Sequence, residues 1–282
     1  MNHQDLIIVR GGGDIATAII HRLWRSGFRV LVLECAYPSA IRRQVAISEA
    51  VYEGEAVVEG MHAVRIEHAA QAECVWAAGN VPVLVDPACS SAAQLCPEIV
   101  IDATIAKRNT GMHIALAPMT IALGPGFFAG EDVHAVIETM RGHNLGRIIS
   151  AGYAAPNTGV PGNIAGYAEE RVIHAPARGV LRAVRRIGDT VEQGETIAVI
   201  EGESGSIPVL ASLSGLIRGL IRDGYPVTKG FKIADIDPRL GEYDNCFTIS
   251  DKARCIAGSV LELVCGHMMK KWAKERQHES GI

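Results

Sequence analysis

The chain has 282 residues, of which 48% are hydrophobic and 21% charged, a balance typical of a globular protein of about two domains. Its net charge of −4 and its aromatic content of 5% argue against a nucleic-acid-binding surface. No apolar run reaches the roughly 18 residues of a membrane span, and the start lacks a secretion-signal pattern. Seven scattered cysteines favour reduced thiols in the cytoplasm, and no metal site is expected from them.

The first predicted elements are a strand, a glycine-rich turn and a helix. The apolar run 6–9 precedes GGGDIA at 11–16, which matches G-x-G-x-x-A, and helically spaced apolar residues follow. A second apolar run, 30–33, ends at Glu34, where a dinucleotide-binding fold grips a ribose hydroxyl. The alternative is that this glycine-rich turn serves only the packing of the strand against the helix and binds no nucleotide. The cofactor-binding candidates in this region are Gly11, Gly12, Gly13, Asp14 and Glu34.

Further strands are expected at 64–66, 81–85 and 99–103, separated by helical stretches near 68–78 and 88–96. Short strands that alternate with helices predict a parallel sheet, and ligands of such sheets lie beyond the carboxyl ends of the strands.

Two cationic segments follow predicted strands. Arg42 and Arg43 come after the second strand, and Lys107, Arg108 and Asn109 come after the strand at 99–103. Arginine pairs bind phosphate or carboxylate in bidentate fashion, so both segments are candidate anion sites. The alternative in each case is a solvated basic turn.

A second glycine loop, GPGFFAG at 124–130, follows the apolar run 119–123. A helix is expected from about 131 to 144 and a strand at 147–149. The loop is either a second phosphate cradle or a tight turn whose phenylalanines fill the core. The candidates in and after this loop are Gly124, Gly126, Asn157 and Asn163. The nearby histidines show no metal-ligand spacing.

A repeat occupies the C-terminal part of the chain. The pattern Gly179-x8-Gly188-x5-Gly194 recurs 36 residues later as Gly215-x8-Gly224-x5-Gly230. It matches the half-unit of biotinyl/lipoyl-type β-sandwiches, whose glycines serve turns with φ > 0. The tip between the copies, 201–208, has no lysine, so a scaffold or recognition module is expected rather than a swinging arm.

The expected fold class is therefore α/β: a Rossmann-like parallel sheet, a C-terminal biotinyl/lipoyl-like β-sandwich and a final helix. The expected domains are 1–170, a nucleotide- or cofactor-binding region; 171–239, the β domain; and 240–282, a loop and helix. Nothing in the sequence determines the oligomeric state, and a homo-oligomer remains one alternative.

Several strings together resemble one family: GGGDIA at 11–16, IRR at 41–43, AKRNTG at 106–111, GPGFFAGEDVHAVIETMRGHNLGR at 124–147, PNTGVPGNIAGY at 156–167, DIDPR at 235–239 and ISDKAR at 249–254. They resemble the YqeB-type proteins of the selenium-dependent molybdenum hydroxylase system, which are similar in role to XdhC-type maturation factors. The resemblance implies a cytoplasmic accessory protein that matures or inserts the molybdopterin cofactor of a molybdenum hydroxylase client.

The implied ligand is a nucleotide-type small molecule, either a molybdopterin dinucleotide or NAD(P). Glu34 favours NAD over NADP, because a 2′-phosphate would meet its carboxylate. The alternatives are an NAD-dependent oxidoreductase or cofactor-modifying transferase, and a purely structural partner of the hydroxylase. No residue is assigned as catalytic, and the sequence does not decide whether the client contains selenium.

Overall fold

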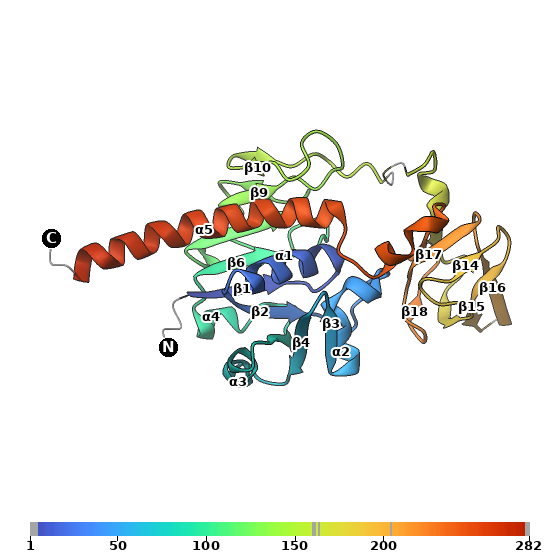
Figure 1. The fold of residues 1–282 in the computed structure, drawn as a ribbon, viewed down its shortest axis with the longest axis horizontal. Coiled ribbons are helices and arrows are strands. Elements are labelled where there is room, and N and C mark those ends of the chain that lie inside the picture. The colour runs from blue at the N-terminus through green and yellow to red at the C-terminus, as the bar shows by residue number, and fades with distance from the viewer. Residues whose placement is uncertain (1–4, 160–161, 163, 204, 280–282) are drawn as a thin grey trace. The chain divides into compact units, whose positions relative to one another are not determined.

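The computed structural model describes residues 5–159, 162, 164–203 and 205–279. The chain forms two compact units (Figure 1). The first contains Met1–Pro38, Ile47–Asn157 and Ser250–Ile282, and the second contains Ser39–Ala46 and Thr158–Ile249.

A nine-stranded sheet forms the centre of the first unit, counted over the described residues. Its strands in sheet order are β3 (Glu55–Val58), β4 (Met61–Ile66), β5 (Val81–Val85), β2 (Arg29–Glu34), β1 (Leu6–Arg10), β6 (Ile99–Asp102), β7 (Met119–Leu123), β9 (Ala135–Ile137) and β10 (Ile148–Ile149). Neighbours from β4 to β9 are parallel, whereas β3 and β10 run antiparallel at the two edges. Because β2 and β6 flank β1 on opposite sides, the order of strands reverses at β1.

Helices cover both faces of this sheet. They are α1 (Asp14–Arg25), α2 (Ala50–Glu53), α3 (Ala72–Ala77), α4 (Ala92–Leu95) and α5 (Asp251–Glu279). Residues of α3 and α4 pack in one buried cluster with Leu6 and Ile8, which point to the same face of β1. The helices α1 and α5 pack against each other and lie side by side along the sheet (Figure 1). The predicted first helix and the predicted strands at 6–9, 30–33, 81–85, 99–103 and 119–123 are confirmed.

The segment after the second glycine loop is not helical as predicted. A short strand, β8 (Phe128–Ala129), pairs with β11 (Gly152–Tyr153), and β9 then joins the large sheet beside β7. The apolar run Ala135–Ile137 is wholly buried there. Pairing with β7 buries every side chain of this run, which an amphipathic helix would not do.

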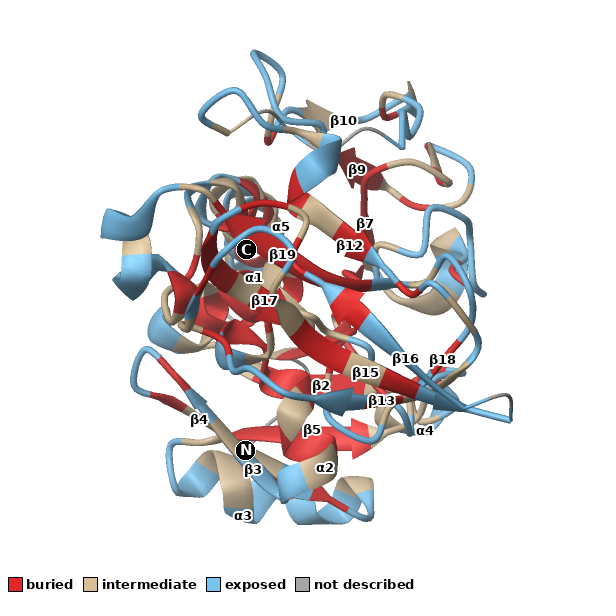
Figure 2. Ribbon diagram, turned by 90° about the vertical axis from the view of Figure 1, so that its right-hand side faces the viewer, coloured by how far each residue is buried: buried red, intermediate tan, exposed pale blue. Residues whose placement is uncertain are grey.

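The second unit consists of two four-stranded antiparallel sheets. One has the order β12 (Val172–His174), β19 (Lys232–Asp237), β17 (Gly215–Leu220) and β14 (Thr190–Val191); the other has β16 (Gly205–Leu210), β15 (Thr196–Gly202), β13 (Gly179–Ala183) and β18 (Pro226–Val227). Their apolar residues form one buried cluster, and the buried stretches of β17 and β19 are visible in Figure 2. The 3-10 helix η7 (Leu240–Cys246) adds Cys246 to this core.

The first glycine of each copy of the 36-residue repeat lies against the backbone of a neighbouring strand. A Cβ atom on Gly179 would lie 2.3 Å from the carbonyl oxygen of Glu201, and one on Gly215 would lie 2.4 Å from that of Asp237. Each copy therefore begins with a glycine because its partner strand passes too close for a side chain.

The predicted fold class, a Rossmann-like parallel sheet with a C-terminal biotinyl/lipoyl-like β-sandwich and a final helix, is wrong. The large sheet is mixed, and its second glycine loop leads into strands. The β-rich unit is also not a continuous C-terminal module. Residues 39–46 belong to it, and the amide of Leu220 donates to the carbonyl of Ile41 at 2.8 Å.

The compact units divide the chain differently from the expected domains 1–170, 171–239 and 240–282. The final helix α5 belongs to the first unit because it packs against α1. Over the residues described, no helix is both long enough and apolar enough to cross a membrane.

The close approach at β17 predicts a large cost for Gly215→Ala. The new methyl group would collide with the backbone of β19, which cannot move without breaking the sheet, so we expect a loss of about 1–3 kcal/mol. The midpoint of guanidinium unfolding measures it. Gly241→Ala is the matched control, because a Cβ atom there meets nothing within 4 Å. Equal effects of the two substitutions would contradict the packing argument.

Candidate functional site

A buried ion pair joins the carboxyl ends of β1 and β6. Arg10 and Asp102 are register partners, with exposed fractions of 3% and 0%, and Nη1 of Arg10 lies 2.8 Å from Oδ2 of Asp102. Nη2 of Arg10 donates to the carbonyl oxygens of Pro87, at 3.2 Å, and of Thr110, at 2.9 Å. Asp102 accepts bonds from the amide and hydroxyl of Thr104. The pair thereby fixes the loops that follow β5 and β6.

The loop after β6 lies across both glycine loops. A Cβ atom on Gly11 would meet the backbone of Ala103 and Thr104 at 3.1–3.2 Å, and one on Gly126 would lie 2.6 Å from the Cα atom of Arg108. We name residues 103–111 the β6 loop. Gly11 and Gly126 are needed because this backbone passes over them. The sequence-predicted candidates Gly11, Gly126, Lys107 and Arg108 are thus brought together.

The conformation of the β6 loop is unusual. Ile105 and Lys107 have φ values of 53° and 61°, which side chains other than glycine rarely adopt. Asn109 accepts bonds from the amides of Gly111 and Met112 and donates to the carbonyl of Met112, so its side chain shapes the loop. Backbone strain of this kind persists only when the surroundings hold the loop in place.

Lys107 and Arg108 are exposed at the tip of the β6 loop. Neither has an ion-pair or hydrogen-bond partner among the residues that the structure describes. Two cations therefore stand unneutralised at the carboxyl edge of the parallel strands.

Side chains of the protein itself already bind part of the first glycine loop. The Glu34 carboxylate accepts bonds from the amide of Gly12 and from that of Cys35, each at 2.7 Å. A Cβ atom on Gly12 would lie 2.9 Å from the backbone nitrogen of Ser48. Burial, and then the Glu34 charge, raise the pKa of Cys35 to about 11, so this thiol stays protonated at neutral pH. Gly12 thus serves packing and binds a carboxylate of the chain itself.

The start of α1 is more open. Gly13 caps the helix, and a Cβ atom there would meet nothing within 4 Å. Asp14 lies in the first turn, half-buried. Burial lowers the pKa of the half-buried Lys252, and the charge of Arg141 lowers it further; the carboxylates of Asp14, Glu138 and Asp251 oppose this. Lys252 therefore lies close enough to Asp14 for the two side chains to interact electrostatically.

The second glycine loop is held by the residues that follow β9. A Cβ atom on Gly124 would lie 2.6 Å from Oγ1 of Thr139. The buried Glu138 accepts bonds from the amides of Met140 and Ala155, both at 2.7 Å. These bonds bring the chain near residue 155 to the carboxyl end of β9.

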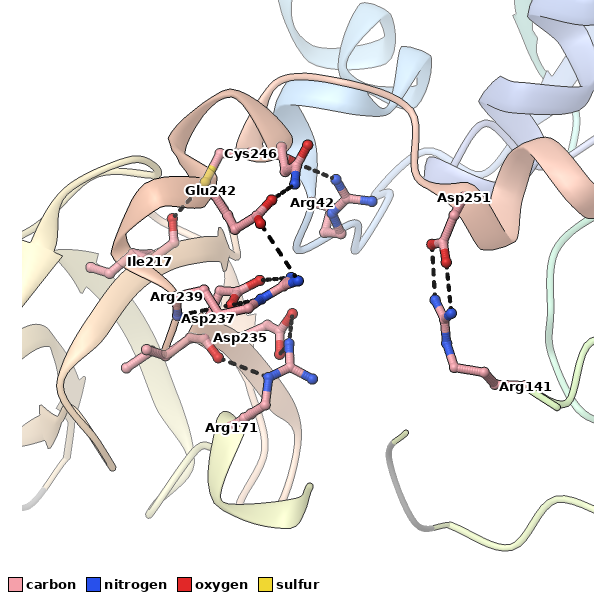
Figure 3. A network of polar contacts seen from close by, with 12 residues as sticks. Arg42, Arg141, Arg171, Ile217, Asp235, Asp237, Arg239, Glu242, Cys246 and Asp251 are labelled. Carbon is pink, nitrogen blue, oxygen red and sulfur yellow. Dashed lines mark hydrogen bonds and ion pairs between the residues drawn. The ribbon is translucent and has the colours of Figure 1, made fainter. Parts of the chain in front are cut away.

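Arg42 and Arg43 do not form an anion site. Both belong to the second unit, where Arg42 donates to the carbonyl oxygens of Asn245, at 2.9 Å, and Thr248, at 3.2 Å. Arg43 donates to the carbonyl of Leu220 at 2.8 Å. Figure 3 shows Arg42 beside η7. The two guanidinium groups fasten residues 39–46 to the β-rich unit, and their donors satisfy backbone acceptors there.

The last two candidates are not part of this arrangement as far as it is described. Asn157 is exposed at the end of the first unit, and Asn163 lies outside the described residues. His134 is not on a helix, and its Nδ1 accepts the amide of Thr120 at 3.0 Å. Within the described part of the chain, no group of three or more His, Cys, Asp or Glu side chains is arranged to hold a metal ion.

Sequence reasoning missed Arg10, Asp102 and Glu138. A signal for the first two was present: each is a charged residue that directly ends an apolar strand run. Both strands end at the same edge of the sheet, so the two charges had to meet or stay unpaired.

No family model matches the chain. It is 49% identical over 275 residues to the uncharacterized protein YqeB of Escherichia coli (strain K12), a match that includes 97% of this chain and 50% of that protein. The chain thus spans about half the length of this relative. The predicted resemblance to YqeB-type proteins is confirmed as a similarity in sequence over nearly the whole of this chain. The implied link to the selenium-dependent molybdenum hydroxylase system, and to XdhC-type factors, finds no support in it.

Among solved structures, the chain is similar to the ectoine utilization protein EutE (DoeB) of Ruegeria pomeroyi (TM-score 0.27, 9% identity, 83% of this chain and 86% of that chain). It is also similar to an aspartoacylase family protein of Mesorhizobium loti (0.29, 12%, 84% and 86%). A third is a succinylglutamate desuccinylase/aspartoacylase of Rhodobacter sphaeroides (0.26, 14%, 83% and 85%). Likenesses this weak do not assign an activity to this chain.

The predicted function is corrected on these findings. The three solved structures reported above are named for ectoine utilization, for the aspartoacylase family and for succinylglutamate desuccinylase/aspartoacylase, and the relative is named an uncharacterized protein. The predicted role as an accessory protein for molybdopterin cofactor maturation or insertion is not borne out by any of these comparisons. The alternative, an NAD-dependent oxidoreductase or cofactor-modifying transferase, gains no support.

The buried ion pair can be tested by charge removal. Arg10→Met leaves Asp102 buried without its cation, so we expect a loss of about 3–5 kcal/mol in the free energy of unfolding. Arg10→Met/Asp102→Leu removes both charges and should recover most of this loss. Guanidinium unfolding measures both variants. A double variant no more stable than the single one would contradict the account of an uncompensated charge.

Proposed function

We propose that the first unit binds a nucleotide-type anionic ligand at the carboxyl ends of β1, β6 and β7. The observation that carries the proposal is the β6 loop, which presents the unpaired Lys107 and Arg108 beside both glycine loops. This edge is also where the strand order reverses, between β1 and β6. In open sheets of parallel strands, ligands bind outside the carboxyl ends at such a reversal.

The charges at this edge favour a diphosphate. Arg108 can bind phosphate oxygens in bidentate fashion, and Lys107 supplies a point charge. Each oxygen of Glu34 accepts one backbone bond and can accept another, so a sugar hydroxyl can donate to it. The carboxylate thus suits the hydroxyl-bearing part of a nucleotide and repels further phosphate.

NAD(P) and a molybdopterin dinucleotide are the candidate ligands, because each joins two groups through a diphosphate. A 2′-phosphate near Glu34 would be repelled, which favours NAD over NADP. The proposal concerns binding and includes no chemical step. A cytoplasmic location is part of it, supported by seven cysteines that are all free thiols.

The experiment is a calorimetric titration of the full chain with inorganic pyrophosphate, ADP and NADH. Lys107→Ala/Arg108→Ala removes charge-assisted bonds worth about 1.5–3 kcal/mol each, so we expect at least tenfold weaker binding of pyrophosphate. Lys274→Ala/Arg276→Ala removes the same two residue types from the exposed end of α5 and should bind like wild type.

Two results would overturn the proposal. One is wild-type protein that binds none of the three compounds at millimolar concentration. The other is a Lys107→Ala/Arg108→Ala variant that is folded and binds them with unchanged affinity.

A further inference from the structure

An exposed tyrosine lies beside the second glycine loop. Tyr153 on β11 is 66% exposed, and its ring meets that of Phe128 on β8 with centroids 4.7 Å apart and planes at 88°. In such an edge-to-face pair, one ring turns its edge toward the face of the other. Whichever ring supplies the edge, Phe128 leaves at least one face of Tyr153 uncovered.

Tyr153 is held in this place from two directions. Its register partner across the small sheet is Phe128. Two residues further along the chain, the amide of Ala155 is bonded to the buried Glu138 at 2.7 Å. The backbone around Tyr153 is therefore held by strand pairing and by the bond from Ala155 to Glu138, and the ring itself is braced by Phe128. A ring fixed in advance loses little conformational entropy when it binds a second ring.

The distance to the β6 loop is short. Phe128 follows Gly126 by two residues, which span at most about 7 Å, and register partners in a ladder lie about 5 Å apart. Tyr153 thus lies within roughly 12 Å of Gly126, measured between Cα atoms. Gly126 in turn contacts the backbone of Arg108. The backbone of Tyr153 and the backbone of the cationic loop are thus both close to Gly126, at a separation comparable to the length of a nucleoside.

We propose that Tyr153 is a stacking platform for the planar heteroaromatic ring of the ligand, while its diphosphate lies on Lys107 and Arg108. This inference rests on the proposed function and names the ring-binding part of the same site. Single exposed apolar side chains are common on protein surfaces. Tyr153 differs in that it is braced by Phe128 and lies beside the loop that carries the unpaired cations. Stacking tolerates any flat ring, so the subsite recognises the ring class and not one base.

The test compares ligands with and without a ring. The dissociation constants of ADP and inorganic pyrophosphate are measured by calorimetry for wild type, Tyr153→Ala and Tyr153→Phe. Stacking of one base is worth about 1–3 kcal/mol, so Tyr153→Ala should weaken ADP binding about 5- to 150-fold and leave pyrophosphate binding unchanged. Tyr153→Phe keeps the ring and should stay within about threefold of wild type for both compounds.

Tyr243→Ala is the matched control. Tyr243 is 52% exposed and packs on Phe247 with centroids 5.1 Å apart, but it belongs to the second unit. The Tyr243→Ala variant should therefore bind ADP with wild-type affinity. Circular dichroism and the unfolding midpoint establish that each variant is folded.

The outcomes separate the two proposals. If wild type binds both compounds and Tyr153→Ala keeps the wild-type ratio of the two affinities, the platform is overturned and the anion site stands. If wild type binds neither compound, the anion site fails and the platform fails with it. If ADP binds in a Tyr153-dependent way and Lys107→Ala/Arg108→Ala leaves its affinity unchanged, a ring subsite remains, but the placement of the diphosphate on Lys107 and Arg108 is overturned.

Discussion

The ion pair between Arg10 and Asp102 is the interaction on which the carboxyl edge of the first unit depends. Burying two charges is costly unless further hydrogen bonds satisfy them. Here those bonds go to Pro87, Thr110 and Thr104, residues in the loops that follow β5 and β6. One buried contact therefore sets the positions of two loops. It also supports the left-handed conformations of Ile105 and Lys107, which an unsupported loop would not keep.

The elements with a strong local signal were predictable from the sequence. α1 and the central strands follow from apolar periodicity, and the repeat follows from glycines at fixed spacing. The segment after Gly130 shows the limit. Its apolar residues fit helical spacing, but Ala135–Ile137 is also a contiguous apolar run, and β7 offers it a parallel partner. Long-range pairing decided between the two structures, and a single sequence does not contain that information.

The candidate site was predictable in part for a related reason. A glycine in a loop permits close approach, but the sequence does not say whether the approaching group is a ligand or the chain itself. At Gly11 and Gly126 it is the β6 loop, and at Gly12 it is Ser48. Arg42 and Arg43 bind carbonyl groups more than 170 residues away along the chain, which no local pattern reveals. Lys107 and Arg108 are exposed, and they are the residues of the predicted anion site on which the proposed function rests.

The central claim is that a nucleotide-type ligand binds on the β6 loop. Hydrogen–deuterium exchange of the full chain, with and without saturating ADP, tests it most directly. The account predicts slower exchange in peptides that contain residues 103–111 and 152–155, with little change in the second unit. Protection confined to the second unit, or exchange that ADP leaves unchanged throughout the chain, would contradict it.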